Sequence, residues 1–413
     1  MLLLAGTFVL SNTTRAVAAG PSTVEAAPSV KAAVDGVLEL FRKNSVVALA
    51  DAHGLAQEEA FYSAIVRDPR FVEEVDNVVV EFGGELSQDI IDRYVAGEDV
   101  PLAELRRVWT ETIGWIPGPT SLGYVNFYAN VRAANLKLSP EHRIKVWLGD
   151  PKVDWSKINS FADAAPYLSR RDDNFFRIIS DDILGKQKRT LLIIGGGHLF
   201  APLGAGPLSA RISGAYPHAL AVVSPFTGYV EPECNARVVA RAKDWPVPAV
   251  VGPVQGTWLK SELLLPGCHY APAVVSFGPG SNKPKKDLGA SGPPGGVVRL
   301  SPGKPSSPDQ KISKEKAVPV APPGVQWLGP GKPPSPEEMT SAMMSGASAD
   351  AILYLGPPDS LTASPVDANI YLDSGYFEQE RRRLRCCTPF GGDLDWDQIL
   401  QENSVVPRKF KVP

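Results

Sequence analysis

The chain has 413 residues and a formal net charge of -3, with 44% hydrophobic and 8% aromatic residues. That length suits one large α/β domain or two smaller ones, and the composition is normal for a packed globular protein. Because no long basic run precedes residue 276, nucleic acid is excluded as an expected partner.

The first 20 residues are expected to be an export signal. Residues 2–10 form an apolar stretch that is too short to span a bilayer as a helix. Ala16-Val17-Ala18 fits a small-residue cleavage site, although no Lys or Arg precedes the apolar stretch, and a frayed tail is the alternative. We predict an exported protein, periplasmic or extracellular, whose mature chain has no transmembrane segment.

Three short apolar runs, at residues 46–50, 78–80 and 191–194, each end beside an ionisable residue or a glycine turn that leads to one. Runs of this length, mostly β-branched or aliphatic, are typical of strands buried on both faces of a parallel sheet. The carboxyl ends of parallel strands lie at one edge, where ligands bind. The side chains that follow the three runs are therefore expected to converge.

Helical patterns separate the predicted strands. We expect helices over residues 58–66, 88–95, 122–138 and 173–184, a helix that begins at Pro101 with Leu102, Leu105 and Trp109 on one stripe, and strands over residues 143–148 and 219–223. Strands that alternate with helices indicate right-handed crossovers. The prediction for residues 30–275 is one α/β core domain with a mostly parallel sheet flanked by helices.

Residues 276–340 differ from the rest of the chain. Pro, Gly, Lys and Ser dominate them and hydrophobic periodicity is lost, which predicts a long disordered linker. Structure is expected to return in residues 341–413, as a strand over 350–356 and a helix over 375–384 whose basic last turn faces solvent. Because a lone strand and helix cannot fold alone, this segment is expected to rejoin the core.

The four cysteines are Cys234, Cys268, Cys386 and Cys387. In an exported protein Cys234 and Cys268 could pair, whereas neighbouring cysteines bond to each other only with strain. Buried free thiols are the alternative for all four. The absence of a Cys-x-x-Cys pair argues against a zinc ribbon.

Four ionisable residues near the predicted strand ends are candidate catalytic groups. His53 follows the first run, and Asp51 lies two positions earlier, on the same side of the strand end. Glu81 ends the second run, where a carboxylate is costly to bury unless it is paired. His198 follows three glycines, which allow a close backbone approach. Imidazoles suit proton transfer at neutral pH, although a histidine that closes a turn and a salt-bridged glutamate are the structural alternatives.

Five further residues are candidate substrate-binding groups: Glu58, Glu59, Asp150, Gly196 and Gly197. The two glutamates follow His53 at helical spacing. Asp150 ends another predicted strand, although an Asp before Pro is also ordinary turn chemistry. The glycine loop could bind an anion through its backbone N–H groups.

These elements resemble a superfamily that joins the erythromycin esterases, the ChaN-like haem-binding proteins and the TraB/Tiki proteins. Its members carry an early Gly-Glu-x-His-like element, an acidic residue that closes a second strand and a late Gly-x-Gly-His element. The matching stretches here are Ala50-Asp51-Ala52-His53-Gly54, Val80-Glu81-Phe82-Gly83 and Gly195-Gly196-Gly197-His198. Asp51 stands where the family usually has Glu, and Ala50 where it has Gly.

Three functions follow from the residues and the resemblance. The first is a hydrolase of erythromycin-esterase-like type that needs no cofactor, in which His53 activates a water to attack an ester-like small-molecule substrate. Asp51 and Glu81 would orient that His or the water, and His198 would stabilise the oxyanion or protonate the leaving group. The alternative is a ChaN-like protein that binds haem or a divalent metal without turnover, through His53, His198 and Glu81. A Tiki-like metal-dependent peptidase is the third.

Overall fold

The computed structural model describes residues 28–114, 121–200, 207–270, 348–367, 369–387 and 408–409. The predicted signal segment 1–20 and linker 276–340 lie outside these residues, so export and disorder stay predictions. In the described part of the chain, no helix has the length and apolar character needed to cross a membrane.

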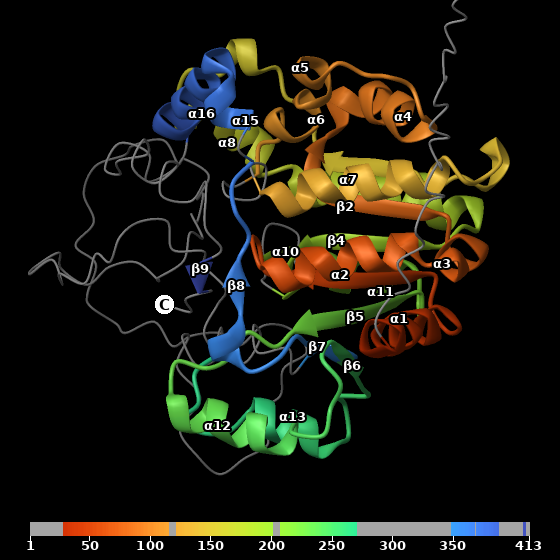
Figure 1. Ribbon diagram of the computed structural model, residues 1–413, viewed down its shortest axis with the longest axis vertical. Helices are drawn as coiled ribbons and strands as arrows, with labels where there is room; N and C mark the ends of the chain where they lie inside the picture. The colour runs from red at the N-terminus through yellow and green to blue at the C-terminus, as the bar shows by residue number, and fades with distance from the viewer. Residues whose placement is uncertain are drawn as a thin grey trace, which may run out of the picture.

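A seven-stranded sheet in the order β3-β2-β4-β1-β5-β7-β6 forms the centre of the molecule (Figure 1). Every pairing is parallel except that of β6 with β7, so the predicted α/β fold with a mostly parallel sheet is confirmed. β7 lies between β5 and β6, which confirms that the C-terminal segment rejoins the core. The strands are β1 (Val46–Asp51), β2 (Asn77–Gly84), β3 (Lys145–Asp150), β4 (Thr190–Gly195), β5 (Leu220–Pro225), β6 (Ala249–Val251) and β7 (Ala351–Tyr354).

Helices cover both faces of the sheet. Successive strand residues point to opposite sides, and both sets are apolar here, so each face is buried against helices. Val47 and Leu49 of β1 pack toward one helical layer, and Val46, Ala48 and Ala50 pack toward the other. The first layer, in front in Figure 1, contains α1 (Pro28–Phe41), α2 (Ala56–Arg67), α3 (Pro69–Glu74), α4 (Gln88–Ala96) and α7 (Leu122–Asn135). The second contains α9 (Arg171–Arg177), α10 (Gly196–Phe200) and α11 (Leu208–Ala215).

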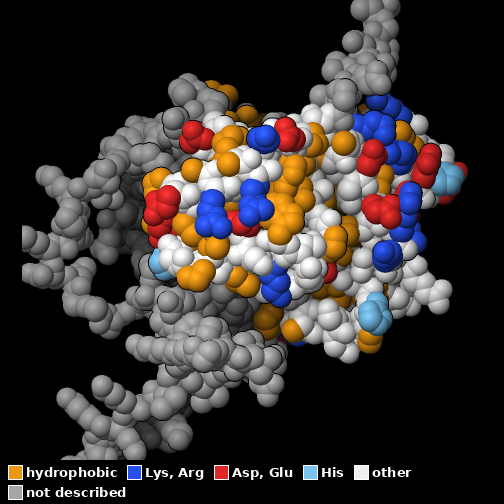
Figure 2. Space-filling view, turned by 90° about the horizontal axis from the view of Figure 1, so that it is seen from below, with side chains coloured by type: hydrophobic (Ala, Val, Ile, Leu, Met, Phe, Trp, Pro, Cys, Tyr) orange, Lys and Arg blue, Asp and Glu red, His pale blue; other side chains and the backbone are white. Residues whose placement is uncertain are grey.

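A smaller unit extends the sheet at one end, at the bottom of Figure 1. α12 (Pro232–Arg241) and α13 (Trp258–Leu263) pack there with β6 and β7 around a separate hydrophobic cluster. A disulfide joins Cys234 to Cys268, as the sequence allowed. Figure 2 shows the molecule from this end, where hydrophobic side chains are interleaved with charged ones.

The opposite end carries α8 (Phe161–Leu168), α15 (Asn369–Leu372) and α16 (Ser374–Cys387). The predicted basic turn of α16 lies one turn before the end of the helix, and one of its residues differs from the prediction, because Arg383 is buried rather than facing solvent. Its guanidinium donates to the carbonyl of Thr110 and lies 4.4 Å from the ring centre of Trp155. Cys386 and Cys387, at the end of the same helix, form the second disulfide.

Two predicted helices differ from the structure. The helix expected from Pro101 is two short ones, α5 (Leu102–Leu105) and α6 (Arg107–Thr110), so Leu102 turns outward and is 46% exposed. The helix expected over 173–184 begins earlier as α9 and continues as a wider π-helical segment, Ile178–Ile183. The short strands β8 (Thr362–Ala363) and β9 (Arg408–Lys409) pair with each other outside the main sheet.

Candidate functional site

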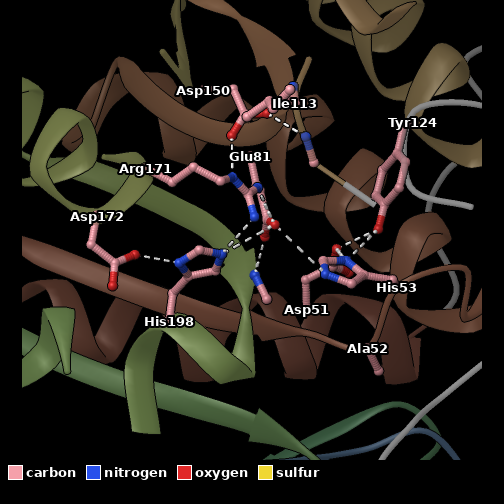
Figure 3. Close-up of polar contacts among 12 residues, drawn as sticks. Asp51, Ala52, His53, Glu81, Ile113, Tyr124, Asp150, Arg171, Asp172 and His198 are labelled. Carbon is pink, nitrogen blue, oxygen red and sulfur yellow. Dashed lines mark hydrogen bonds and ion pairs between the residues drawn. The ribbon is translucent and has the colours of Figure 1, made fainter. Parts of the chain in front are cut away.

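The candidate site lies at the C-terminal edge of the sheet, where neighbouring strands end level. Asp51 of β1 lies beside Gly195 of β4. Glu81 follows Val80 of β2, which lies beside Ile193 of β4. The parallel register therefore brings the two predicted carboxylates to one edge, with the end of β4 between them (Figure 3).

The turn after β1 holds His53 against Asp51. Nδ1 of His53 lies 2.7 Å from Oδ2 of Asp51, because both residues lie on the same side of the strand end. The hydroxyl of Tyr62 donates to Oδ1 of Asp51 at 2.8 Å, and the hydroxyl of Tyr124 donates to Oδ2. The side chain of Asp51 is 1% exposed and that of His53 is 30% exposed, so the imidazole is the part of this pair that reaches solvent.

His198 faces the same edge from α10, which continues directly from β4. Its Nδ1 contacts Oδ1 of Asp172, at the start of α9. Each of the two imidazoles is therefore bonded to an aspartate through Nδ1, and each directs Nε2 toward the space between them (Figure 3).

Glu81 occupies that space. Its Oε1 lies 3.7 Å from Nε2 of His53 and 3.4 Å from Nε2 of His198. Its Oε2 accepts from the backbone N–H of Gly195. A Cβ at position 195 would lie 2.7 Å from Nε2 of His53 and 3.0 Å from Oε2 of Glu81, so the close approach requires glycine here.

A buried arginine links the carboxylates. Arg171 donates through Nη2 to Glu81 and through Nε to Asp150, both at 2.6 Å, and its Nη1 lies 3.1 Å from Nε2 of His198. The other oxygen of Asp150 accepts from the backbone N–H groups of residues 113–114, at 2.8 and 2.9 Å. Because buried charges are tolerated only when they are paired and hydrogen-bonded, this network fixes Glu81 in place.

The network sets the charge of each group at the edge. Burial lowers the pKa of His53, but the carboxylates of Glu81 and Asp51 raise it, to about 9. Burial also lowers the pKa of His198, but Glu81 and the hydrogen bond to Asp172 together outweigh that effect, so this pKa is raised too. Burial disfavours ionised Glu81, yet His53, Arg171 and His198 hold its pKa well below the usual range. At neutral pH the site therefore contains a charged His53 ring beside the ionised carboxylate of Glu81, and the same carboxylate favours the charged form of His198.

Glu58 and Glu59 lie behind this edge, in the first turn of α2, and both are buried. Oε2 of Glu58 accepts from the backbone N–H of Ala52 at 2.8 Å, and Oε1 of Glu59 accepts from the hydroxyl of Ser121 at 2.6 Å. Burial raises the pKa of Glu58 well above its usual range and that of Glu59 to about 8. These contacts are with the chain itself, and substrate binding by the two glutamates stays a prediction.

The remaining predicted residues differ in their surroundings. Asp150 is fully buried and contacts Arg171. A Cβ at Gly196 would make ordinary contacts at 3.7 Å, and one at Gly197 would meet no described atom within 4 Å. The close approach of backbone to side chains that the three glycines predicted therefore occurs at Gly195.

Four residues of this network were missed in the sequence: Tyr62, Tyr124, Arg171 and Asp172. Arg171 and Asp172 lie in a run of four charged residues that is typical of a solvated helix start. The two tyrosines occupy buried positions of predicted helices, where an aromatic side chain is normally a core residue. No local pattern distinguishes any of them.

The donor atoms do not fit a metal centre. The guanidinium of Arg171 contacts the same Glu81 oxygen that faces both imidazoles, and a fixed cation there competes with a divalent ion. In the described ranges, no group of three or more His, Cys, Asp and Glu side chains is arranged to hold a metal ion. Glu81 and Arg171 also fill the space between the two rings that a haem bound by both histidines would need.

Comparison with known proteins yields little. No protein-family model and no curated protein matches the chain. The type III effector HopBA1 superposes with a TM-score of 0.30 and 14% identity, over 48% of this chain and 82% of its own. A Bacillus cereus protein superposes with a TM-score of 0.39 and 10% identity, over 62% of this chain and 88% of its own. Similarity at this level carries no argument about function.

Proposed function

We propose that this protein is a hydrolase of the erythromycin-esterase-like type, which cleaves an ester-like bond in a small molecule. One observation carries the proposal: Nε2 of His53 and Nε2 of His198 lie 3.7 and 3.4 Å from the same oxygen of Glu81. Two imidazoles that flank an ionised carboxylate can serve as base and acid toward one substrate. The resemblance of the strand-end motifs to the erythromycin esterases supports the same reaction class.

His53 is the proposed general base. Asp51 accepts from its Nδ1, which leaves Nε2 as the atom that takes a proton. Nε2 removes a proton from a water beside Glu81 while the water oxygen attacks the carbonyl carbon of the ester. The raised pKa of His53 means that this step uses the minor, neutral form of the ring at neutral pH.

His198 is the proposed general acid. Glu81 and Asp172 raise its pKa and so favour the protonated ring, and Asp172 anchors that ring through Nδ1. When the tetrahedral intermediate collapses, the carbon–oxygen bond to the alcohol breaks and the proton of Nε2 moves to the leaving oxygen. His53 then carries the proton taken from water, and Glu81, within 4 Å of both rings, lies on the path that returns it to His198.

Arg171 and Asp150 are proposed positioning residues for this step. The guanidinium of Arg171 keeps Glu81 ionised and oriented, and the carboxylate of Asp150 keeps Arg171 in place. Preorganised charges of this kind lower a barrier because they need no rearrangement during the reaction.

The proposal is tested with the purified full chain and a panel of aryl esters, alkyl esters and macrolactones. We expect hydrolysis by the wild type and a loss of roughly 100-fold or more in His53→Ala and in His198→Ala, the size of a general acid–base contribution. His142→Ala is the matched control, because His142 is 71% exposed and its contacts in the described part of the chain are with Ser139 and Glu141 of its own turn. If no substrate is hydrolysed faster by the wild type than by His53→Ala, the hydrolase proposal is wrong.

A further inference from the structure

Asp51 accepts hydrogen bonds from three different parts of the fold. Tyr62 of α2 donates to Oδ1 at 2.8 Å. Tyr124 of α7 and Nδ1 of His53 share Oδ2, the latter at 2.7 Å. Both tyrosines are fully buried. The carboxylate is therefore held at both oxygens, and one of those oxygens serves two donors (Figure 3).

Tyr128 provides a comparison for the contact of Tyr124 with Asp51. Tyr128 lies one turn further along α7, is equally buried, and donates to the backbone carbonyl of Phe82 at 2.8 Å. A buried phenol needs one acceptor, and β2 supplies a neutral one for Tyr128. Tyr124 instead uses the charged oxygen that bonds His53, and its hydroxyl lies 3.4 Å from Nδ1 of that ring.

We propose that Tyr124 and Tyr62 are positioning residues that orient the Asp51 carboxylate and set the strength of its hydrogen bond to His53. A hydrogen bond to a charged oxygen is among the strong ones, and a second donor on the same oxygen weakens the first by sharing its charge. Tyr124 thereby limits how tightly Asp51 holds His53, while Tyr62 stops the carboxylate from rotating away.

Other charged groups also surround His53, and Glu58 among them is hydrogen-bonded to Tyr62. Glu81 faces it from β2, Arg171 from α9, and Glu58 and Glu59 from α2. None of these groups contacts the hydroxyl of Tyr124 through a hydrogen bond described here. Removal of that hydroxyl alone should therefore act on His53 through Asp51.

The test compares Tyr124→Phe with Tyr128→Phe, two changes that each delete one buried hydroxyl from α7. The Nδ1 proton of His53, identified in the downfield proton spectrum by its loss in His53→Ala, should move further downfield in Tyr124→Phe because Oδ2 then serves His53 alone. It should stay in place in Tyr128→Phe. A second expectation, on the rate, rests on the proposed hydrolase function. At pH 7 the kcat of Tyr124→Phe should fall about three- to tenfold with KM unchanged, because the pKa of the base rises by about half to one unit.

An unmoved Nδ1 resonance in Tyr124→Phe would overturn the inference, as would an equal movement in Tyr128→Phe. Should Tyr124→Phe fail to fold by circular dichroism, Tyr62→Phe decides instead, because release of Oδ1 should broaden or shift the same resonance. The spectrum needs no substrate. If the protein hydrolyses no substrate, the functional proposal is wrong, but the spectrum still tests this inference. If the enzyme is active and the resonance does not move, only this inference is wrong.

Discussion

At the scale of single residues, the protonation state of His53 decides when the proposed reaction can run. Its pKa of about 9 exceeds the ordinary value of 6.5, so the ring is mostly charged at neutral pH. A general base must be neutral. Below about pH 6.5 the general acid His198 keeps its proton, so we expect kcat/KM to rise about tenfold per pH unit between about pH 5 and pH 6. At alkaline pH the rate should fall again as His198 loses its proton, which gives a bell-shaped profile. Initial rates corrected for uncatalysed hydrolysis measure this profile.

Asp51→Asn supplies the control for this profile. Asp51 is one of the two carboxylates that raise the pKa of His53, so its replacement should move the ascending limb to lower pH while the maximum rate falls. A kcat/KM that decreases with pH between about 5 and 6 would contradict the assignment, because the charged imidazole would then be the active form and His53 would act as an acid.

The sequence predicted the residues of the site only where they lie at or just after the end of a predicted strand. Asp51, His53, Glu81 and His198 each follow a buried apolar run, and the common direction of parallel strands brings them together. Arg171 has no such mark, because its position depends on how α9 packs on β3, a tertiary contact that local patterns do not encode.

At the scale of elements, a buried carboxylate joins α2 to the start of α7. Glu59 accepts from the hydroxyl of Ser121, which also caps α7 by accepting from the N–H of Gly123 at 3.3 Å. Burial raises the pKa of Glu59 from 4.5 to about 8, so the folded state binds this proton more tightly than the unfolded state does. The stability contributed by the proton is complete below pH 4.5 and is lost as pH rises through about 8.

Glu59→Gln removes this proton linkage. Between pH 5 and pH 8 the free energy of unfolding of the wild type should decrease relative to that of the variant by ~3 kcal/mol, at 1.36 kcal/mol per unit. Urea unfolding at several pH values measures the difference. Glu39→Gln, at a side chain that is 57% exposed, should show no such divergence. Parallel pH curves for wild type and Glu59→Gln would mean that Glu59 is ionised in the folded protein.

Most elements followed from periodicity, and the exceptions have physical reasons. The helices α2, α4 and α7 and the central strands were predicted from their apolar spacing. The pattern over Pro101 to Trp109 predicted one helix, but the chain turns at Arg106, so that α5 packs against α4 and α6 packs against β2. β6 was not predicted, because an antiparallel edge strand of three residues is too short to show an alternation of apolar and polar residues.

At the scale of the whole molecule, the C-terminal segment completes the sheet and reaches the candidate site. β7 joins β5 to β6, and the chain then runs along the sheet edge at the left of Figure 1. There Ser364 donates its N–H to the carbonyl of Gly54 at 2.7 Å, and Leu122 donates to the carbonyl of Pro365 at 2.9 Å. The turn that carries His53 and the start of α7 are thus tied together by residues more than 200 positions later in the sequence.

This arrangement predicts that a destabilising substitution in β7 lowers the stability of the whole sheet. Leu353 is fully buried in the main core and lies beside Pro225 of β5 and Val250 of β6. Leu353→Ala should lower the free energy of unfolding by ~2–4 kcal/mol, since it removes apolar contacts and leaves a cavity. Because β7 is an interior strand, hydrogen exchange should report the same loss in the amides of β1 as in those of β7.

Leu372→Ala is the matched control for that change, because Leu372 is 83% exposed and the same truncation there should cost little. If Leu353→Ala speeds exchange only in β6, β7 and α12–α13 while β1 keeps its full protection, the C-terminal segment is a separately melting unit attached to a stable core. If the amides of β1 and β7 lose protection equally, the sheet unfolds as one cooperative unit. The turn that carries His53 then depends for its stability on a strand from beyond residue 350.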